Sequence, residues 1–389
     1  MSANSSRSPL IDIVKGLACI TIVWHHLAFY GPMSDIAQPL APALMAFLYD
    51  YGRMAVQVFL VVGGYLAAAS LAPQGVARFD HAGNAIAKRF VRLVVPYAVA
   101  LVVTVVVSAL VRTWMDHPSV PEAPTLGQLV ANALLLQDLV GEDALSAGVW
   151  YVAVDFQLFS LSVLVWAAVR ALPGPWAQHH RAALARGLIV AGAAASLWFF
   201  NRMAGLDMWA LYFFGAYGLG ILAYWAVQAP RAHAWVAAMV LMGGAALVLD
   251  FRGRIAVAVV TALCLVLVMR RGRSSQSAEG RSAPWTGRVT VALQRLGARL
   301  ARVGQMSYSV FLVHFAVCLL VNAVVGTLWP TSAAVNALGM LLAFGLSLAA
   351  GRWLYLRVER HVPSWSTALR WQAGLVGTGL LVALSNNWA

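Results

Sequence analysis

The stretch KGLACITIVWHH, residues 15–26, is an apolar run that begins with a lysine and closes with two histidines. It belongs to a longer apolar run from residue 10 to residue 30, which has the length of a membrane-spanning helix, about 20 residues. Ionisable groups inside a bilayer are costly, and they usually face a protein interior where they serve a site. The run therefore predicts a spanning first helix whose charged and polar ends have a function.

The rest of the chain has the composition of a polytopic membrane protein. Of its 389 residues, 61% are hydrophobic and 11% are charged, whereas an average soluble domain has roughly 25% charged residues. The first run carries Asp12 and Lys15 and is too long for a cleavable signal core, so we expect it to be retained. We predict an all-α bundle of about 10 to 11 transmembrane helices around a channel, with spans near residues 10–30, 48–72, 90–112, 148–170, 187–202, 208–227, 233–250, 254–270, 306–327, 334–357 and 372–385.

Basic residues collect on alternate connections between these spans, which marks those connections as cytoplasmic and places the N-terminus inside. They are Arg78, Lys88, Arg89 and Arg92, then Arg170, Arg181 and Arg186, then Arg231, then a cluster between residues 270 and 302, then Arg352, Arg357, Arg360 and Arg370. The net charge of +13 is explained by loops beside anionic lipid, so we expect no nucleic-acid partner. Cys19, Cys264 and Cys318 lie in apolar runs and offer neither a disulfide framework nor metal-ligand spacing.

Residues 271–305 form the only soluble-looking insertion. Its first half has linker composition. From residue 289 to residue 303, apolar residues recur at spacings of four and three with arginines between them, which predicts a basic amphipathic helix. This helix lies either on the inner leaflet or as a lid over a cytoplasmic mouth, because amphipathicity does not distinguish the two.

Lys15 and His26 define the first candidate site. They are 11 positions apart, which is about 16 Å along a helix and within about 20° of one face. His25 points about 100° aside, so we take it as a packing or interfacial partner. A cation and an imidazole at this spacing suit a ligand that is anionic at its cytoplasmic end and reactive at its outer end, as a coenzyme A thioester is. The alternative is that Lys15 snorkels to the headgroups and His26 makes one interhelical hydrogen bond.

Two further groups fit the same ligand. Arg89 and Arg92 share a helical face at the cytoplasmic start of the third span, where guanidinium groups can grip phosphate, although ordinary positive-inside charge explains them too. Asp155 lies about 7 Å below the outer interface, at a depth similar to that of His26. Its carboxylate could orient or charge-stabilise that imidazole, or it could pair with another helix.

The ninth span adds Tyr308 and His314. His314 lies about 12 Å from the cytoplasmic side, where it either lines the path of the ligand or bonds to a neighbouring helix. Gly63 and Gly64 in the second span predict close helix packing. Glu359, between Arg357 and Arg360, is more typical of a charge-paired helix terminus than of a site.

Together these motifs resemble the acyltransferase-3 family of integral membrane acyltransferases. The resemblance rests on Lys15 and His26 in the first helix, Arg89, Arg92 and Pro96 in the third, Trp150, Asp155 and Gln157, then Ser307, Tyr308, Ser309 and His314, and finally Glu359, Arg360 and Pro363. The chain departs from the family pattern at Lys15 (usually Arg), Asp155 (usually Glu), Gly63 (usually Ser) and Gln57 (usually acidic). The similar region runs to residue 363, and residues 364–389 form an additional hydrophobic helix.

The resemblance implies an integral membrane O-acyltransferase of bacterial type, and the Arg-rich and Ala-rich composition with its charge pattern suits a bacterial inner membrane. The family moves an acyl group, most often acetyl, from cytoplasmic acyl-CoA to a hydroxyl of an extracytoplasmic glycan or glycolipid, without a metal. His26 would be the general base, oriented by Asp155, or would itself be acylated. The donor would be held by Lys15, Arg89, Arg92, Tyr308 and His314. Two other classes remain open: a proton-coupled transporter or flippase of an envelope precursor, which the absence of evident internal repeats disfavours, and an assembly partner in an envelope complex.

Overall fold

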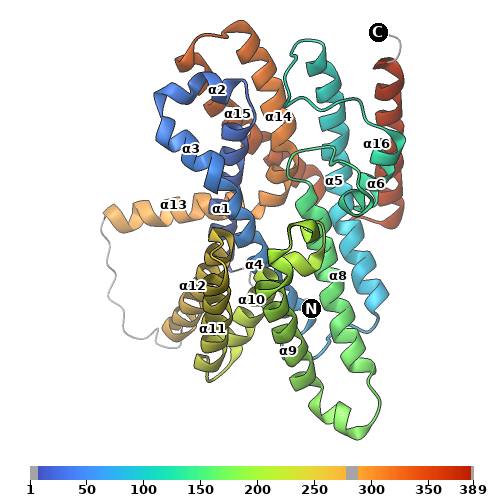
Figure 1. Cartoon of the computed structure of the whole chain (residues 1–389), viewed down its shortest axis with the longest axis vertical. Coiled ribbons are helices and arrows are strands. Elements are labelled where there is room, and N and C mark those ends of the chain that lie inside the picture. Colours follow the sequence, from blue (N-terminus) through green and yellow to red (C-terminus); the bar gives the residue numbers. More distant parts are fainter. Residues whose placement is uncertain (1–7, 277–287, 387–389) are drawn as a thin grey trace. The chain divides into compact units, whose positions relative to one another are not determined.

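The computed structural model describes residues 8–276 and 288–386, and within these ranges every regular element is helical (Figure 1). The α-helices are α1 Pro9–Phe29, α2 Met33–Ala37, α3 Pro42–Tyr51, α4 Ala55–Leu71, α5 Ala82–Arg112, α6 Leu126–Ala133, α7 Gln137–Val140, α8 Trp150–Ala171, α9 Pro175–Trp198, α10 Ala210–Gln228, α11 His233–Leu249, α12 Gly253–Gln276, α13 Arg288–Gln305, α14 Ser307–Leu328, α15 Ala333–Leu354 and α16 Trp365–Asn386. Short 3-10 turns at Gln38–Leu40, Gly52–Met54, Phe200–Arg202 and Ala204–Leu206 and a π turn at Tyr355–Glu359 complete the elements.

Nine helical stretches of the described chain are long and apolar enough to cross a membrane. This confirms the predicted multi-pass helical bundle. The segment predicted at 233–250 is α11, an apolar helix of only 17 residues. The segment predicted at 372–385 lies in α16, which begins at Trp365 and is not among the nine.

Several helices extend beyond the apolar segments that predicted them. Helix α9 begins 12 residues before the predicted residue 187, and α5 begins 8 residues before residue 90. Helix α12 continues to Gln276, into the stretch expected to be linker, and the rest of that stretch, residues 277–287, lies outside the described residues. The added turns of α9 are rich in Ala and Arg, which are strong helix formers. Hydropathy therefore marks the bilayer segment but not the helix end.

The chain divides into two compact units, and the boundaries fall at the start of α4 and within α5, α8 and α13. Unit 1 comprises residues 1–55, 89–153 and 298–389, and unit 2 comprises residues 56–88 and 154–297, as far as the structure describes them. The predicted division at residue 363 stays a prediction. Unit 1 thus combines the first helix of the chain with the last three and with the second half of α13.

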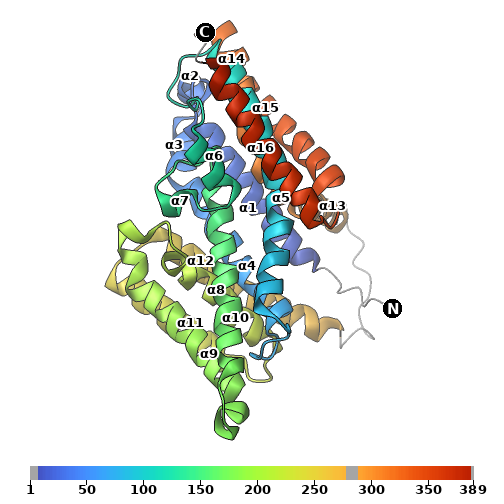
Figure 2. The ribbon, with the colours of Figure 1, turned by 90° about the vertical axis from the view of Figure 1, so that its right-hand side faces the viewer.

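Unit 1 is built around α14. Helix α15 runs beside α14 in both views of the molecule (Figures 1 and 2), and Gly351 lets the two backbones touch at Val310. Helix α1 lies on another side of α14, where buried Asn322 anchors the chain that follows α1. The Asn322 side chain accepts from the Met33 N–H at 2.9 Å and donates to the Tyr30 carbonyl at 3.3 Å. These bonds fix the end of α1 that carries the two histidines.

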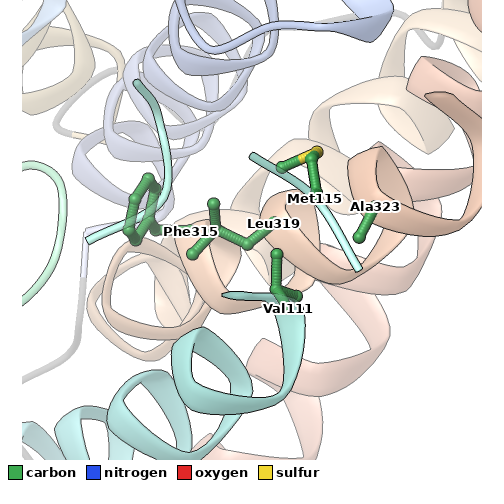
Figure 3. Close-up of a cluster of buried hydrophobic side chains, with 5 residues drawn as sticks. All are labelled: Val111, Met115, Phe315, Leu319 and Ala323. Carbon is green, nitrogen blue, oxygen red and sulfur yellow. The ribbon is translucent and has the colours of Figure 1, made fainter. Parts of the chain in front are cut away.

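An apolar cluster joins α5 to α14 directly beyond His314. Val111 and Met115, at the end of α5 and just after it, face three residues of α14 (Figure 3), namely Phe315, Leu319 and Ala323. The ring of Tyr30 packs edge-on against Phe315, with 5.0 Å between ring centroids. Apolar groups therefore close the side of α14 that follows His314.

In unit 2, α4 and α10 cross with their backbones in contact. A Cβ on Gly64 would lie 1.8 Å from the carbonyl oxygen of Tyr217, and a Cβ on Gly220 would lie 1.9 Å from that of Val61. The backbones are thus in direct contact on both sides of the crossing, which small residues allow in membrane helices. This confirms the close packing predicted for the glycines of the second span.

Candidate active site

Two buried histidines from opposite ends of the sequence meet in unit 1. His26 on α1 is 7% exposed and His314 on α14 is fully buried. The Nδ1 atom of His26 lies 2.6 Å from the Nε2 atom of His314. The ring planes differ by 9° and the centroids are 4.8 Å apart, so the rings meet edge to edge through these nitrogens. His314 thus bonds to a neighbouring helix, and its place along the path of the ligand stays a prediction.

The remaining ring nitrogens of the two histidines differ in their hydrogen-bond partners. The Nδ1 atom of His314 lies 2.7 Å from the carbonyl oxygen of Phe311, one turn earlier on α14. The Nε2 atom of His26 has no hydrogen-bond partner among the described residues. One nitrogen of His26 is thus held by the protein, while the other is unoccupied by any side chain or backbone group of the described chain.

Two further polar rings, those of Tyr30 and His25, lie beside His26. The ring of Tyr30 lies 5.6 Å from that of His26 between centroids. His25 turns away, and its Nδ1 atom lies 2.9 Å from the carbonyl oxygen of Leu48 on α3. This confirms the expectation that His25 is a packing partner.

Gly148, which the sequence did not single out, lies against the His26 ring. Its φ is +78°, and a Cβ there would lie 3.2 Å from His26 Cε1 and 3.1 Å from Phe311 Cζ. The segment before it is tied down by Asn132, which is fully buried on α6. Its side chain donates to the Asp143 carbonyl at 2.9 Å and accepts from the Leu145 N–H at 3.1 Å. This loop therefore forms a fixed wall beside the imidazole.

The other end of α1 meets the start of α14 among charged groups. Glu359 accepts from the Ser309 N–H at 3.1 Å and from the Ser309 hydroxyl at 2.6 Å. Its carboxylate thereby caps the N-terminus of α14, where negative charge is favoured. Lys15 and Arg92 both interact electrostatically with this carboxylate. Lys15 and Arg92 thus both act on Glu359, a residue that sequence reasoning had set aside.

Two contacts hold this charged end in place. The Tyr308 hydroxyl donates to the Leu93 carbonyl on α5 at 2.9 Å, which ties α14 to the residue after Arg92. Helix α13 touches α1 beside Lys15, since a Cβ on Gly16 would lie 2.2 Å from the Leu300 carbonyl oxygen. Arg89 is half-buried on α5 and Arg92 is exposed.

Asp155 belongs to unit 2. It is buried on α8, and a Cβ on Gly63 would lie 3.5 Å from its Oδ1 atom and 3.2 Å from the Tyr217 ring. The partner that the structure gives to His26 is His314, and the pairing of Asp155 with His26 stays a prediction. Gln157, two residues further on, binds backbone atoms of the 208–210 segment: it donates to the Met208 carbonyl at 3.2 Å and accepts from the Ala210 N–H at 3.0 Å.

In the described part of the chain, no group of three or more His, Cys, Asp or Glu side chains is arranged to hold a metal ion. Cys19, Cys264 and Cys318 are all free thiols.

Comparison with known families decides the class of protein. The model of the acyltransferase-3 family, described as an acyltransferase domain, matches residues 9–386. The chain belongs to the acyltransferase-3 family. No curated protein and no solved structure matches the sequence significantly. In this acyltransferase, the region that matches the family model begins with α1 and ends with α16. It therefore includes both buried histidines and the charged end of α14.

Gly148→Ala is expected to lower the turnover of the acyltransferase by roughly 10- to 100-fold, because a displaced catalytic group costs rate steeply. The added methyl group enters the space beside His26 Cε1. The matched control is Gly141→Ala, at φ +76° with nothing within 4 Å of a Cβ. Both variants carry the backbone strain of a non-glycine residue at positive φ. Turnover of the two purified variants should therefore differ, and equal turnover would contradict a role for Gly148 beside the imidazole.

Proposed function

We propose that this acyltransferase transfers an acetyl group from cytoplasmic acetyl-CoA to a hydroxyl of an extracytoplasmic glycan or glycolipid, in a bacterial inner membrane. The observation that carries the proposal is the state of His26, a buried imidazole with one nitrogen held by His314 and the other without a partner in the described chain. Such an imidazole is suited to take a proton from an attacking hydroxyl. The distribution of basic loops supports the orientation, with the Lys15 end of α1 in the cytoplasm.

In this reaction His26 acts as general base at Nε2. The acceptor oxygen attacks the thioester carbonyl carbon while its proton passes to His26 Nε2. The C–S bond then breaks, the new ester C–O bond remains, and the coenzyme A thiolate leaves with the proton returned from His26. The burial of the imidazole favours this chemistry because water is kept from the thioester. We assign Asp155 to stabilising the positive charge that His26 carries between the two proton transfers.

The donor's phosphates are assigned to the charged end of α1 and α14. Lys15, Arg89 and Arg92 supply the cations, and guanidinium groups bind phosphate bidentately. Lys15 and His26 lie about 16 Å apart along α1, which a pantetheine arm can bridge. We assign Tyr308 to this site through its hold on α5, since its hydroxyl already donates to the Leu93 carbonyl.

Arg89→Ala/Arg92→Ala is expected to weaken acetyl-CoA binding on the order of 100-fold, because each charged hydrogen bond to a phosphate contributes about 1.5–3 kcal/mol. Calorimetry on the detergent-purified protein, with release of free coenzyme A followed in the same samples, measures both binding and transfer. The matched control is Arg295→Ala/Arg299→Ala, which removes two exposed arginines of α13. Its affinity should change little.

Two results would count against this donor site. Equal weakening in both double variants would show that binding follows overall charge rather than the arginines of α5. A folded wild-type protein that binds neither acetyl-CoA nor longer acyl-CoAs would favour the transporter or flippase class instead.

A further inference from the structure

The contacts around the two histidines determine where their protons lie. A carbonyl oxygen only accepts hydrogen bonds, so the 2.7 Å contact between Phe311 O and His314 Nδ1 places a proton on that nitrogen. In a neutral imidazole the other nitrogen is then an acceptor. The 2.6 Å contact to His26 Nδ1 is therefore donated by His26. Its remaining nitrogen, Nε2, carries the lone pair.

We propose that His314 is a positioning residue that fixes the tautomer of His26, so that the basic nitrogen of His26 is Nε2. The Phe311 carbonyl oxygen sets the direction of the hydrogen bond between the two histidines. It belongs to the same helix as His314 and can only accept a hydrogen bond. The proposed consequence for catalysis rests on the function proposed above. The proton arrangement itself is independent of that function.

The opposite arrangement would leave buried groups in conflict. A proton on His314 Nε2 would point a lone pair of Nδ1 at the Phe311 carbonyl, so that two acceptors would face each other at 2.7 Å. Both rings are buried, and an unsatisfied buried polar group is costly. Aromatic rings pack beside the two histidines. Phe311 lies edge-on against Tyr151, with 5.8 Å between ring centroids, and Tyr30 lies edge-on against Phe315, with 5.0 Å between ring centroids.

The hydrogen bond from His26 Nδ1–H to His314 Nε2 also suits the state in which His26 is protonated on both ring nitrogens. When His26 accepts a proton at Nε2, its Nδ1–H continues to donate to His314, so the ring gains charge without losing its orientation. The same proton leaves from Nε2 to the departing thiolate. His314 contacts neither the acceptor nor the thioester in this scheme and acts only through His26. Its role resembles that of any group that sets an imidazole tautomer.

Two substitutions at position 314 separate positioning from packing. His314→Gln places an amide oxygen near the position of Nε2, where it can accept from His26, whereas His314→Asn keeps a donor near Nδ1 but does not reach His26. We expect His314→Asn to lower the maximal rate of acyl transfer by about 10- to 100-fold, with an unchanged KM for acyl-CoA. His314→Gln should recover most of that loss. Equal losses in the two variants would overturn the positioning role.

The tautomer can be read directly by ¹⁵N magic-angle-spinning NMR of histidine-labelled protein in lipid bilayers. His26→Ala identifies the His26 signals among the nine histidines of the chain. We expect wild-type His26 to be neutral and protonated at Nδ1, and we expect the Nε2-protonated form to appear in His314→Asn. A wild-type His26 protonated at Nε2 would overturn the proposal. If the tautomer is as expected but no acyl-CoA is turned over, the proposed function fails while this inference stands.

Discussion

His26→Ala is expected to lower acyl transfer by about 10²–10⁴-fold, which is the usual contribution of a general base. The variant removes a buried imidazole whose Nε2 atom has no hydrogen-bond partner among the described residues. Binding of acyl-CoA at the Lys15 end of α1 should be retained, because that end lies about 16 Å away along the helix. Rate measurement at saturating acyl-CoA, together with calorimetry, separates the loss of chemistry from a loss of binding.

His25→Ala is the matched control, since it removes the neighbouring imidazole of the same helix. His25 is bound to the Leu48 carbonyl on α3 and lies against Gly52. Its loss should lower thermal stability and leave the rate per folded molecule close to that of the wild type. Wild-type turnover in a folded His26→Ala protein would rule out the mechanism, and a large rate loss in both variants would show that the effect is structural.

The second large effect is expected from Gly220→Val, which should abolish recovery of folded protein or lower its thermal midpoint by more than about 10 °C. A Cβ at position 220 would lie 1.9 Å from the Val61 carbonyl oxygen and 2.9 Å from the Tyr65 backbone nitrogen. Backbone atoms cannot move aside as a flexible side chain can, so α4 and α10 must separate. Such overpacking belongs to the mechanisms that cost more than about 4 kcal/mol.

Gly244→Val provides the comparison for Gly220→Val. Gly244 lies within α11, and nothing lies within 4 Å of a Cβ added there. The two variants share the same change of helix propensity but differ in the space available. Fluorescence-detected size exclusion and thermal melting in detergent should show a monodisperse Gly244→Val protein and an aggregated or strongly destabilised Gly220→Val protein. Similar melting of both would show that the α4–α10 crossing tolerates expansion.

The sequence predicted the membrane helices because their signal is local. A stretch of about 20 apolar residues must form a helix to satisfy its backbone in lipid, and nine such stretches are present in the described residues. The helix ends were harder to predict. The first turns of α9 are polar and basic, yet they continue the helix because nothing in the Ala-rich and Arg-rich sequence stops it.

The candidate site was only partly predictable, because its pairings are tertiary. Periodicity on one helix identified His26 and separated it from His25, and a polar residue in an apolar span drew attention to His314. That the two rings meet depends on which faces of α1 and α14 touch, and no local pattern carries that information. Gly148 was missed for the same reason, since its φ and its contact with His26 follow from the loop that Asn132 anchors.

The separation of the two histidines has a consequence for biosynthesis. His26 enters the membrane with the first helix, and its partner is 288 residues further along the chain. At about 5–20 residues per second, roughly 15–60 s pass before His314 is synthesised. During this time the His26 ring must find another partner, such as water, a lipid headgroup or the insertion machinery. Pairing of the two histidines is therefore one of the last events of assembly, and, with the function proposed above, truncation before α14 is expected to leave an inserted but catalytically inert protein.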